Sequence, residues 1–121
     1  MEDQRPLILV VEDNAIIRWS AVDIAREAGF EALEAADASS AIQILESRPE
    51  IRLVFTDVEM PGSMDGIKLA HYIRGRWPPI KLLVASGKVI IQEGQLPEGA
   101  RFFPKPYRHH HIADAIRDML L

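Results

Sequence analysis

The sequence contains no cysteine, so disulfide bonds and metal sites built from thiolates are excluded. It also has no long apolar run. The run LILVV at residues 7–11 is far shorter than the roughly 20 residues that span a bilayer. Because the first residues, MEDQRP, are polar, we expect neither a signal peptide nor a membrane segment. These absences agree with a reducing compartment, and we expect a cytoplasmic protein.

Basic residues are too few and too scattered for a nucleic-acid-binding surface. The chain has 14 Lys and Arg against 18 Asp and Glu, a formal net charge of -4, and no long basic stretch. We therefore expect no nucleic-acid partner. The 121 residues are 48% hydrophobic, which is enough for one core, and they contain neither an internal repeat nor a linker-like stretch. This composition predicts a single domain over residues 1–121.

Short apolar runs alternate with segments of helical periodicity. Strands are expected at residues 7–11, 30–35, 52–56, 80–85 and 100–103. Helices are expected from Ile17 to a stop near Gly29, after a cap at Asp37 over residues 39–47, over residues 66–76, and at the C-terminus with Ile112, Ala115, Ile116, Met119 and Leu120 on one face.

Five strands separated by helices predict an α/β fold. Parallel neighbours need crossover connections, so we expect a flavodoxin-like, doubly wound, five-stranded parallel sheet in the order 2-1-3-4-5. The segment between Ser86 and Phe103 contains three glycines, a proline and the β-branched run Val89, Ile90 and Ile91. These residues are poor helix formers, so the fourth helix is expected to be short or missing.

Polar side chains stand where four of the expected strands end: Glu12 and Asp13, Asp57, Ser86, and Lys105. In a parallel sheet these ends meet at one edge, which is where ligands bind. Taken singly, each residue is an ordinary cap, turn or surface residue. Together they predict three carboxylates that need a hard cation such as Mg²⁺, and an Asp57 nucleophile for phosphoryl transfer. Lys105 and Ser86 suit the phosphoryl oxygens.

Four motifs resemble those of a response-regulator receiver domain of two-component signalling: VVEDN, DVEMPGSMDG, VASG and FFPKPY. The resemblance covers essentially the whole chain. It implies that Mg²⁺ is held by Glu12, Asp13, Asp57 and the backbone carbonyl of Glu59, and that no organic cofactor is bound. It also implies a cis Lys105-Pro106 bond, which only proline makes accessible at low cost.

The resemblance further implies a phosphoacceptor switch. Asp57 would receive a phosphoryl group from a histidine kinase or a histidine phosphotransfer protein in a phosphorelay. Ser86 would then move to the phosphoryl group while Phe102 turns inward, which changes the binding of a downstream protein. Such a domain catalyses its own phosphorylation and dephosphorylation but is not a turnover enzyme. It stands alone or forms part of a larger hybrid protein.

The chain departs from the family pattern beside the expected site. The loop after Asp57 is one residue longer than usual, at Gly62 and Ser63. Glu59 and Lys88 are expected to form an ion pair across the site mouth. Exposed pairs contribute only ~0–1 kcal/mol, so the effect on phosphoryl lifetime should be modest.

Two other functions would use a similar set of residues or the same fold. A haloacid-dehalogenase-like phosphatase also uses an aspartate nucleophile with Mg²⁺, but its nucleophile follows the first strand, where this chain has Glu12 and Asp13. A phosphorylation-independent interaction module would not need the complete set of acidic, hydroxyl and lysine positions. Both alternatives are weaker than the receiver domain.

Overall fold

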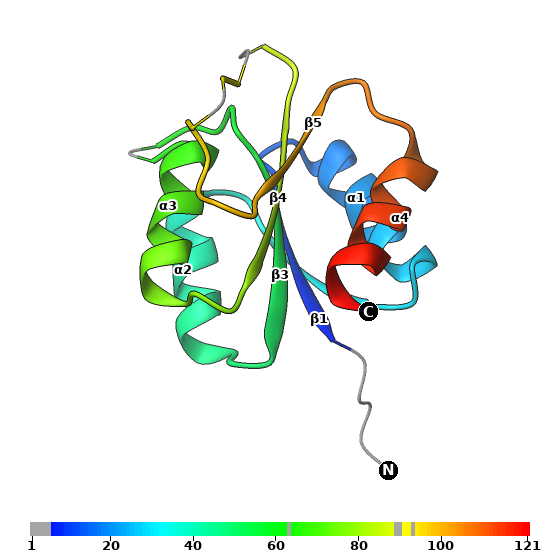
Figure 1. Ribbon diagram of the computed structural model, residues 1–121, viewed down its shortest axis with the longest axis horizontal. Helices are drawn as coiled ribbons and strands as arrows, with labels where there is room; N and C mark the ends of the chain where they lie inside the picture. The colour runs from blue at the N-terminus through cyan, green and yellow to red at the C-terminus, as the bar shows by residue number, and fades with distance from the viewer. Residues whose placement is uncertain (1–5, 63, 89–90, 93) are drawn as a thin grey trace.

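The computed structural model describes residues 6–62, 64–88, 91–92 and 94–121. Its centre is a five-stranded parallel sheet in the order β2-β1-β3-β4-β5, as the sequence predicts (Figure 1). The strands are β1 (Leu7–Val11), β2 (Glu31–Ala35), β3 (Ile51–Asp57), β4 (Lys81–Ser86) and β5 (Arg101–Pro104). The helices are α1 (Ala15–Glu27), α2 (Ala38–Ser47), α3 (Gly66–Arg76) and α4 (His109–Leu120).

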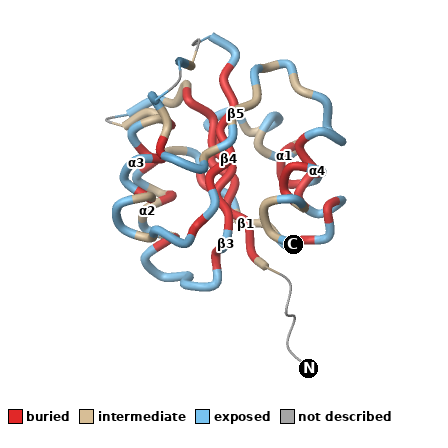
Figure 2. The backbone as a smooth tube through the Cα atoms, viewed as in Figure 1, coloured by how far each residue is buried: buried red, intermediate tan, exposed pale blue. Residues whose placement is uncertain are grey.

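Helices cover both faces of the sheet and create two apolar cores. Helices α2 and α3 pack on one face, and α1 and α4 pack on the other (Figure 1). Strand β1 serves both: Leu9 and Val11 face the α2/α3 core, whereas Ile8 and Val10 face the α1/α4 core. This double burial explains why the segment is continuously apolar rather than alternating. In Figure 2 the buried residues concentrate in the central strands.

Side-chain caps define where three helices begin. Asn14 Oδ1 accepts hydrogen bonds from the amides of Ile16 and Ile17, at 3.0 and 3.1 Å, at the start of α1. Asp37 and Asp65 cap α2 and α3 in the same way. Each cap satisfies amides that have no partner within the helix. After α1, Gly29 adopts a φ of 101°, in the left-handed region that glycine accepts readily.

The connection from β4 to β5 contains no helix among its described residues, 87–88, 91–92 and 94–100. This agrees with the predicted loss of the fourth helix, although Val89 and Ile90, part of that prediction, lie outside the described residues. The helix called α4 therefore follows β5. Within the described part of the chain, no helix is long and apolar enough to cross a membrane.

Candidate functional site

The register of the parallel sheet brings the predicted site residues to one edge. Val11 pairs with Thr56, Asp57 with Ala85, and Ser86 with Pro104. The side chains that follow or end these strands therefore meet at their carboxyl ends. The Lys105 amide donates a hydrogen bond to the Ser86 carbonyl at 2.8 Å, which fixes the start of the β5–α4 connection beside β4.

Lys105 joins two buried carboxylates. Its Nζ lies 3.1 Å from Glu12 Oε1 and 3.0 Å from Asp57 Oδ1. Glu12 and Asp57 are only 5% and 7% exposed. Burial raises the pKa of Asp57, an effect that Lys105 opposes and that the charges of Glu59 and Asp13 reinforce. Burial likewise raises the pKa of Glu12.

Burial and charge also act in opposite directions on the pKa of Lys105. Burial by itself would lower it, but the Asp57 and Glu12 carboxylates outweigh burial and raise the pKa above its ordinary value. Lys105 is therefore a permanent cation at neutral pH. The Lys105-Pro106 peptide bond is cis, as the resemblance implied.

Glu12, Asp13 and Asp57 form a set of donors suited to a hard cation. One carboxylate oxygen from each lies within 4.8 Å of the others. Asp57 Oδ1 is buried and, despite its ion pair with Lys105, accepts no well-directed hydrogen bond among the described residues. These three carboxylates carry more negative charge than the single Lys105 ammonium neutralises, and such a set fits Mg²⁺, which binds few protein ligands and keeps several waters. The role expected for the Glu59 carbonyl stays a prediction.

Among the ion pairs of the described residues, the one expected between the Glu59 carboxylate and the Lys88 ammonium is not found. Its Oε1 accepts hydrogen bonds from the backbone amides of Gly87 at 2.9 Å and Lys88 at 3.1 Å. Its Oε2 accepts one from the Ser86 hydroxyl at 2.6 Å. Burial would raise the pKa of Glu59, but these three hydrogen bonds lower it below its ordinary value. Glu59 therefore contacts Lys88 through the Lys88 backbone amide.

Two residues that the sequence reasoning did not assign to the site also support it. The Asn14 amide donates to Glu12 Oε2 at 3.1 Å, so the residue that caps α1 also orients a carboxylate of the site. Gly66 packs so closely on the end of β3 that a Cβ at this position would lie 2.0 Å from the Asp57 carbonyl oxygen. The signal for Asn14 was available, because an Asn between a strand and a helix is a typical N-cap.

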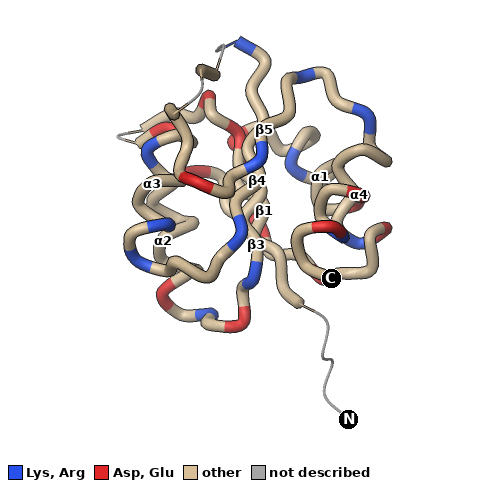
Figure 3. The backbone as a smooth tube through the Cα atoms, in the orientation of Figure 1, with Lys and Arg blue, Asp and Glu red and all other residues tan. Residues whose placement is uncertain are grey.

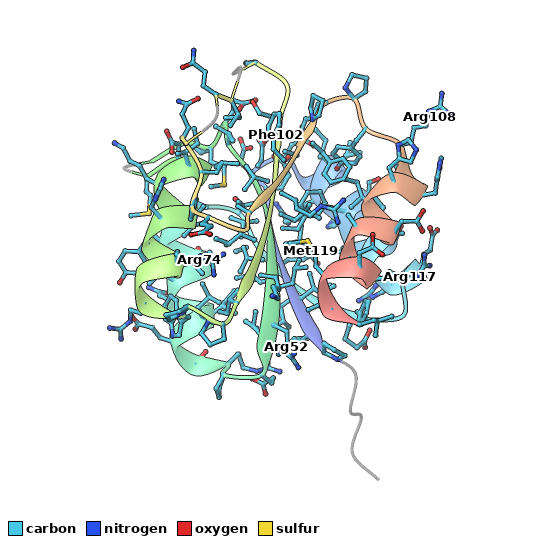
Figure 4. All side chains as sticks on the ribbon, viewed as in Figure 1. Arg52, Arg74, Phe102, Arg108, Arg117 and Met119 are labelled. Atoms are coloured by element: carbon cyan, nitrogen blue, oxygen red, sulfur yellow. The ribbon has the colours of Figure 1, made fainter. Side chains whose placement is uncertain are left out.

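Phe102, the predicted switch aromatic, lies on β5, where it pairs with Val84 of β4. It is half-buried and packs against the α2/α3 core. Figure 4 labels it at the site end of the sheet, near the carboxyl ends of the strands. Along the backbone, Lys and Arg positions are interspersed with Asp and Glu positions (Figure 3). Of the inserted pair Gly62 and Ser63, Gly62 is exposed, and Ser63 lies outside the described residues.

The structure thus gathers the Asp57 carboxylate, the Lys105 ammonium, the Ser86 hydroxyl and the acidic pair Glu12 and Asp13 at one edge of the sheet. Residues 8–117 match the family model described as the response regulator receiver domain. The chain belongs to this family. Receiver domains are phosphoacceptor switches of two-component signalling, and this function is assigned to the chain in preference to a phosphatase.

Known relatives support the assignment. The chain is 33% identical over 117 residues to Sensor kinase CckA of Brucella abortus, covering 93% of this chain and 12% of that protein. It is 30% identical over 117 residues to Sporulation initiation phosphotransferase F of Bacillus subtilis, covering 93% and 92%. It also spans only 23% of the response regulator protein FleR of Pseudomonas aeruginosa, at 33% identity over 112 residues and 90% of this chain. The chain therefore corresponds to a small part of some relatives and to nearly all of another.

Solved structures share the fold. The receiver domain of the hybrid histidine kinase CckA superposes with a TM-score of 0.81 at 34% identity, covering 95% of this chain and 99% of that one. A response regulator receiver protein from Pseudomonas putida gives a TM-score of 0.84 at 27% identity, covering 97% and 99%. Both receiver structures therefore share the overall fold of this chain.

Proposed function

We propose that Asp57 is the phosphoacceptor and that its phosphorylation depends on Mg²⁺. The observation that supports this most directly is the buried Asp57 carboxylate, 3.0 Å from the Lys105 ammonium and beside Glu12 and Asp13. The donor would be a phosphohistidine of a histidine kinase or histidine phosphotransfer protein. Glu12, Asp13, Asp57 and the Glu59 carbonyl would hold the cation, which supplies charge neutralisation at the transferred phosphoryl group.

The chemistry is a nucleophilic displacement at phosphorus. An Asp57 carboxylate oxygen attacks the phosphorus, the phosphorus–nitrogen bond of the phosphohistidine breaks, and the imidazole leaves with its electron pair and takes up a proton. The Lys105 ammonium neutralises a phosphoryl oxygen, and the Ser86 hydroxyl donates to another. Attack of water on the same phosphorus returns the Asp57 carboxylate and inorganic phosphate. The chain thereby catalyses both its phosphorylation and its dephosphorylation while acting as a switch.

Ser86 and Phe102 would carry the change away from the site. Ser86 ends β4, and Phe102 lies on the adjacent strand, paired with Val84. Phosphorylation changes the populations of two conformations only if these conformations bind the phosphoryl group unequally. The conformation in which Ser86 contacts the phosphoryl group would therefore also be the one in which Phe102 is repacked. Methyl NMR of the free and phosphorylated protein tests this. Chemical-shift changes confined to residues around Asp57 would contradict the coupling of Ser86 to Phe102.

The output is binding to another protein or relay of the phosphoryl group. We place the domain, residues 1–121, in the cytoplasm, either alone or within a larger hybrid protein, with no nucleic-acid or membrane contact of its own. The downstream partner is a protein that distinguishes the two states of the switch.

Intact mass spectrometry after incubation with acetyl phosphate tests the proposal. Wild type should gain the mass of one phosphoryl group in the presence of Mg²⁺, and hydroxylamine should remove it. Asp57→Asn should gain nothing, whereas Asp23→Asn, which alters an exposed aspartate of α1, should behave as wild type. A gain that survives Asp57→Asn or that needs no Mg²⁺ would refute it.

A further inference from the structure

Three hydrogen-bond donors at the end of β4 converge on a single acceptor. The Ser86 hydroxyl lies 2.6 Å from one oxygen of the Glu59 carboxylate. The amides of Gly87 and Lys88 lie 2.9 and 3.1 Å from its other oxygen. Two successive backbone amides with an adjacent hydroxyl are the kind of donor set that binds oxyanions in proteins. The carboxylate of Glu59 is the oxyanion that this donor set now holds.

The donor set lies next to the phosphoacceptor. Ser86 directly follows Ala85, the residue that pairs with Asp57 across β3 and β4, and the Val58 amide donates to the Ala85 carbonyl at 2.9 Å. The negative charge of Glu59 contributes to the raised pKa of Asp57, as expected of two carboxylates that share one site. A phosphoryl group on Asp57 would present oxygens to the same donors.

We propose that Glu59 is an internal ligand of this donor set, and that it must leave the set before a phosphoryl group on Asp57 can be bound there. The idea that Glu59 competes with a phosphoryl group rests on the proposed function of Asp57. The idea that Glu59 occupies the Ser86, Gly87 and Lys88 donors does not. Glu59 thereby lowers the affinity of the site for an incoming anion and holds Ser86 until phosphorylation. It acts as a positioning residue and takes no part in the bond changes.

Hydrogen exchange tests the occupation in the absence of metal and phosphodonor. NMR is used to follow the Gly87 and Lys88 amides in wild type, Glu59→Ala and Glu98→Ala. The last variant removes an exposed carboxylate from the same β4–β5 connection. Loss of the acceptor should accelerate exchange of both amides roughly tenfold in Glu59→Ala, while Glu98→Ala should match wild type. Unchanged exchange in Glu59→Ala would overturn the occupation.

Binding of fluoroberyllate, a phosphoryl analogue, tests the competition. With Mg²⁺ present, Glu59→Ala should bind it roughly tenfold more tightly than wild type and Glu98→Ala, because no internal carboxylate has to be displaced. Equal affinities, with normal phosphorylation of Asp57, would overturn the competition alone. An absence of binding in every variant, together with an absence of phosphorylation, would overturn the proposed function and the competition with it.

Glu59→Asp separates occupation of the donors from simple charge repulsion. This variant keeps the negative charge but shortens the side chain by one methylene. If occupation of the donors governs affinity, faster exchange of the Gly87 and Lys88 amides in this variant should be accompanied by tighter binding of fluoroberyllate. Fast exchange combined with wild-type affinity would show that charge alone sets the affinity, and would overturn the proposal.

Discussion

Alanine at Gly66 should disrupt the connection between α3 and β3, the strand that ends in Asp57. Gly66 is buried at the first position of α3, and its amide donates to the Val58 carbonyl at 2.9 Å. A Cβ here would lie 2.0 Å from the Asp57 carbonyl oxygen and 2.7 Å from the Val58 Cα. Both are backbone atoms, so no side-chain rotation relieves the clash.

The cost follows from the distance that must open. Real Cβ contacts stay above 3.0 Å, so the helix start and the end of β3 must separate by about 1 Å. Overpacking of this kind costs typically 1–3 kcal/mol, and because the whole helix start must move, we expect about 3 kcal/mol for Gly66→Ala. The same shift displaces Asp57 from Lys105, so phosphorylation by acetyl phosphate should slow as well.

Gly75→Ala is the matched control within the same helix. Gly75 is exposed, and nothing lies within 4 Å of its added Cβ. Gly75 lies in the last turn of α3, so alanine there should stabilise the protein by about 0.5 kcal/mol, because glycine is a poor helix former. Urea unfolding midpoints measure both changes. Two changes of the same sign, or an unaltered midpoint for Gly66→Ala, would refute the close-approach argument.

Three further predictions concern charge and capping. Mg²⁺ should raise the unfolding temperature, and this stabilisation should weaken on acidification. Because the pKa values of Glu12 and Asp57 are raised, the weakening should begin at a pH above the ordinary pKa values of carboxylates. Calorimetry at several pH values checks this, and a stabilisation independent of pH would contradict it. Lys105→Met should cost about 1–2 kcal/mol at pH 7. This deficit should shrink as the pH falls, because burial raises the pKa values of the Glu12 and Asp57 carboxylates that pair with Lys105. Urea unfolding at pH 7 and at lower pH measures it, and a deficit independent of pH would argue against the ion pairs. Asn14→Ala should cost about 1 kcal/mol and Asn14→Ser far less, since serine also caps; equal losses in thermal unfolding would dismiss the cap.

Much of the fold is readable from the sequence because its signals are local. The helix expected over residues 66–76 is α3 with the same bounds, since Asp65 can cap it and Pro78 cannot continue it. The run at residues 7–11 is β1, which is buried on both faces. Parallel crossovers restrict the possible strand orders to a few, and the predicted order 2-1-3-4-5, which the structure has, gathers the polar strand ends at one edge.

The contacts of Glu59 were not readable in the same way. The sequence shows a Glu and a Lys of opposite charge, so an ion pair between the side chains was the expectation. The acceptor is instead satisfied by the backbone amides of Gly87 and Lys88, and every non-proline residue carries such an amide. Only the path of the chain after β4 determines whether these amides point at Glu59. Gly66 poses the same difficulty, because its letter does not distinguish a turn from a close backbone approach.

Charge balance links the cation to the release of Glu59. Glu12, Asp13, Asp57 and Glu59 bring four carboxylates to the site, and Lys105 brings one ammonium. A phosphoryl group on Asp57 adds further negative charge, and like charges at short range repel strongly in a partly buried site. A divalent cation among the first three carboxylates offsets part of this charge, and withdrawal of the fourth into solvent removes another part. Because both changes favour the phosphorylated state, Mg²⁺ binding and the departure of Glu59 from its donors should reinforce one another.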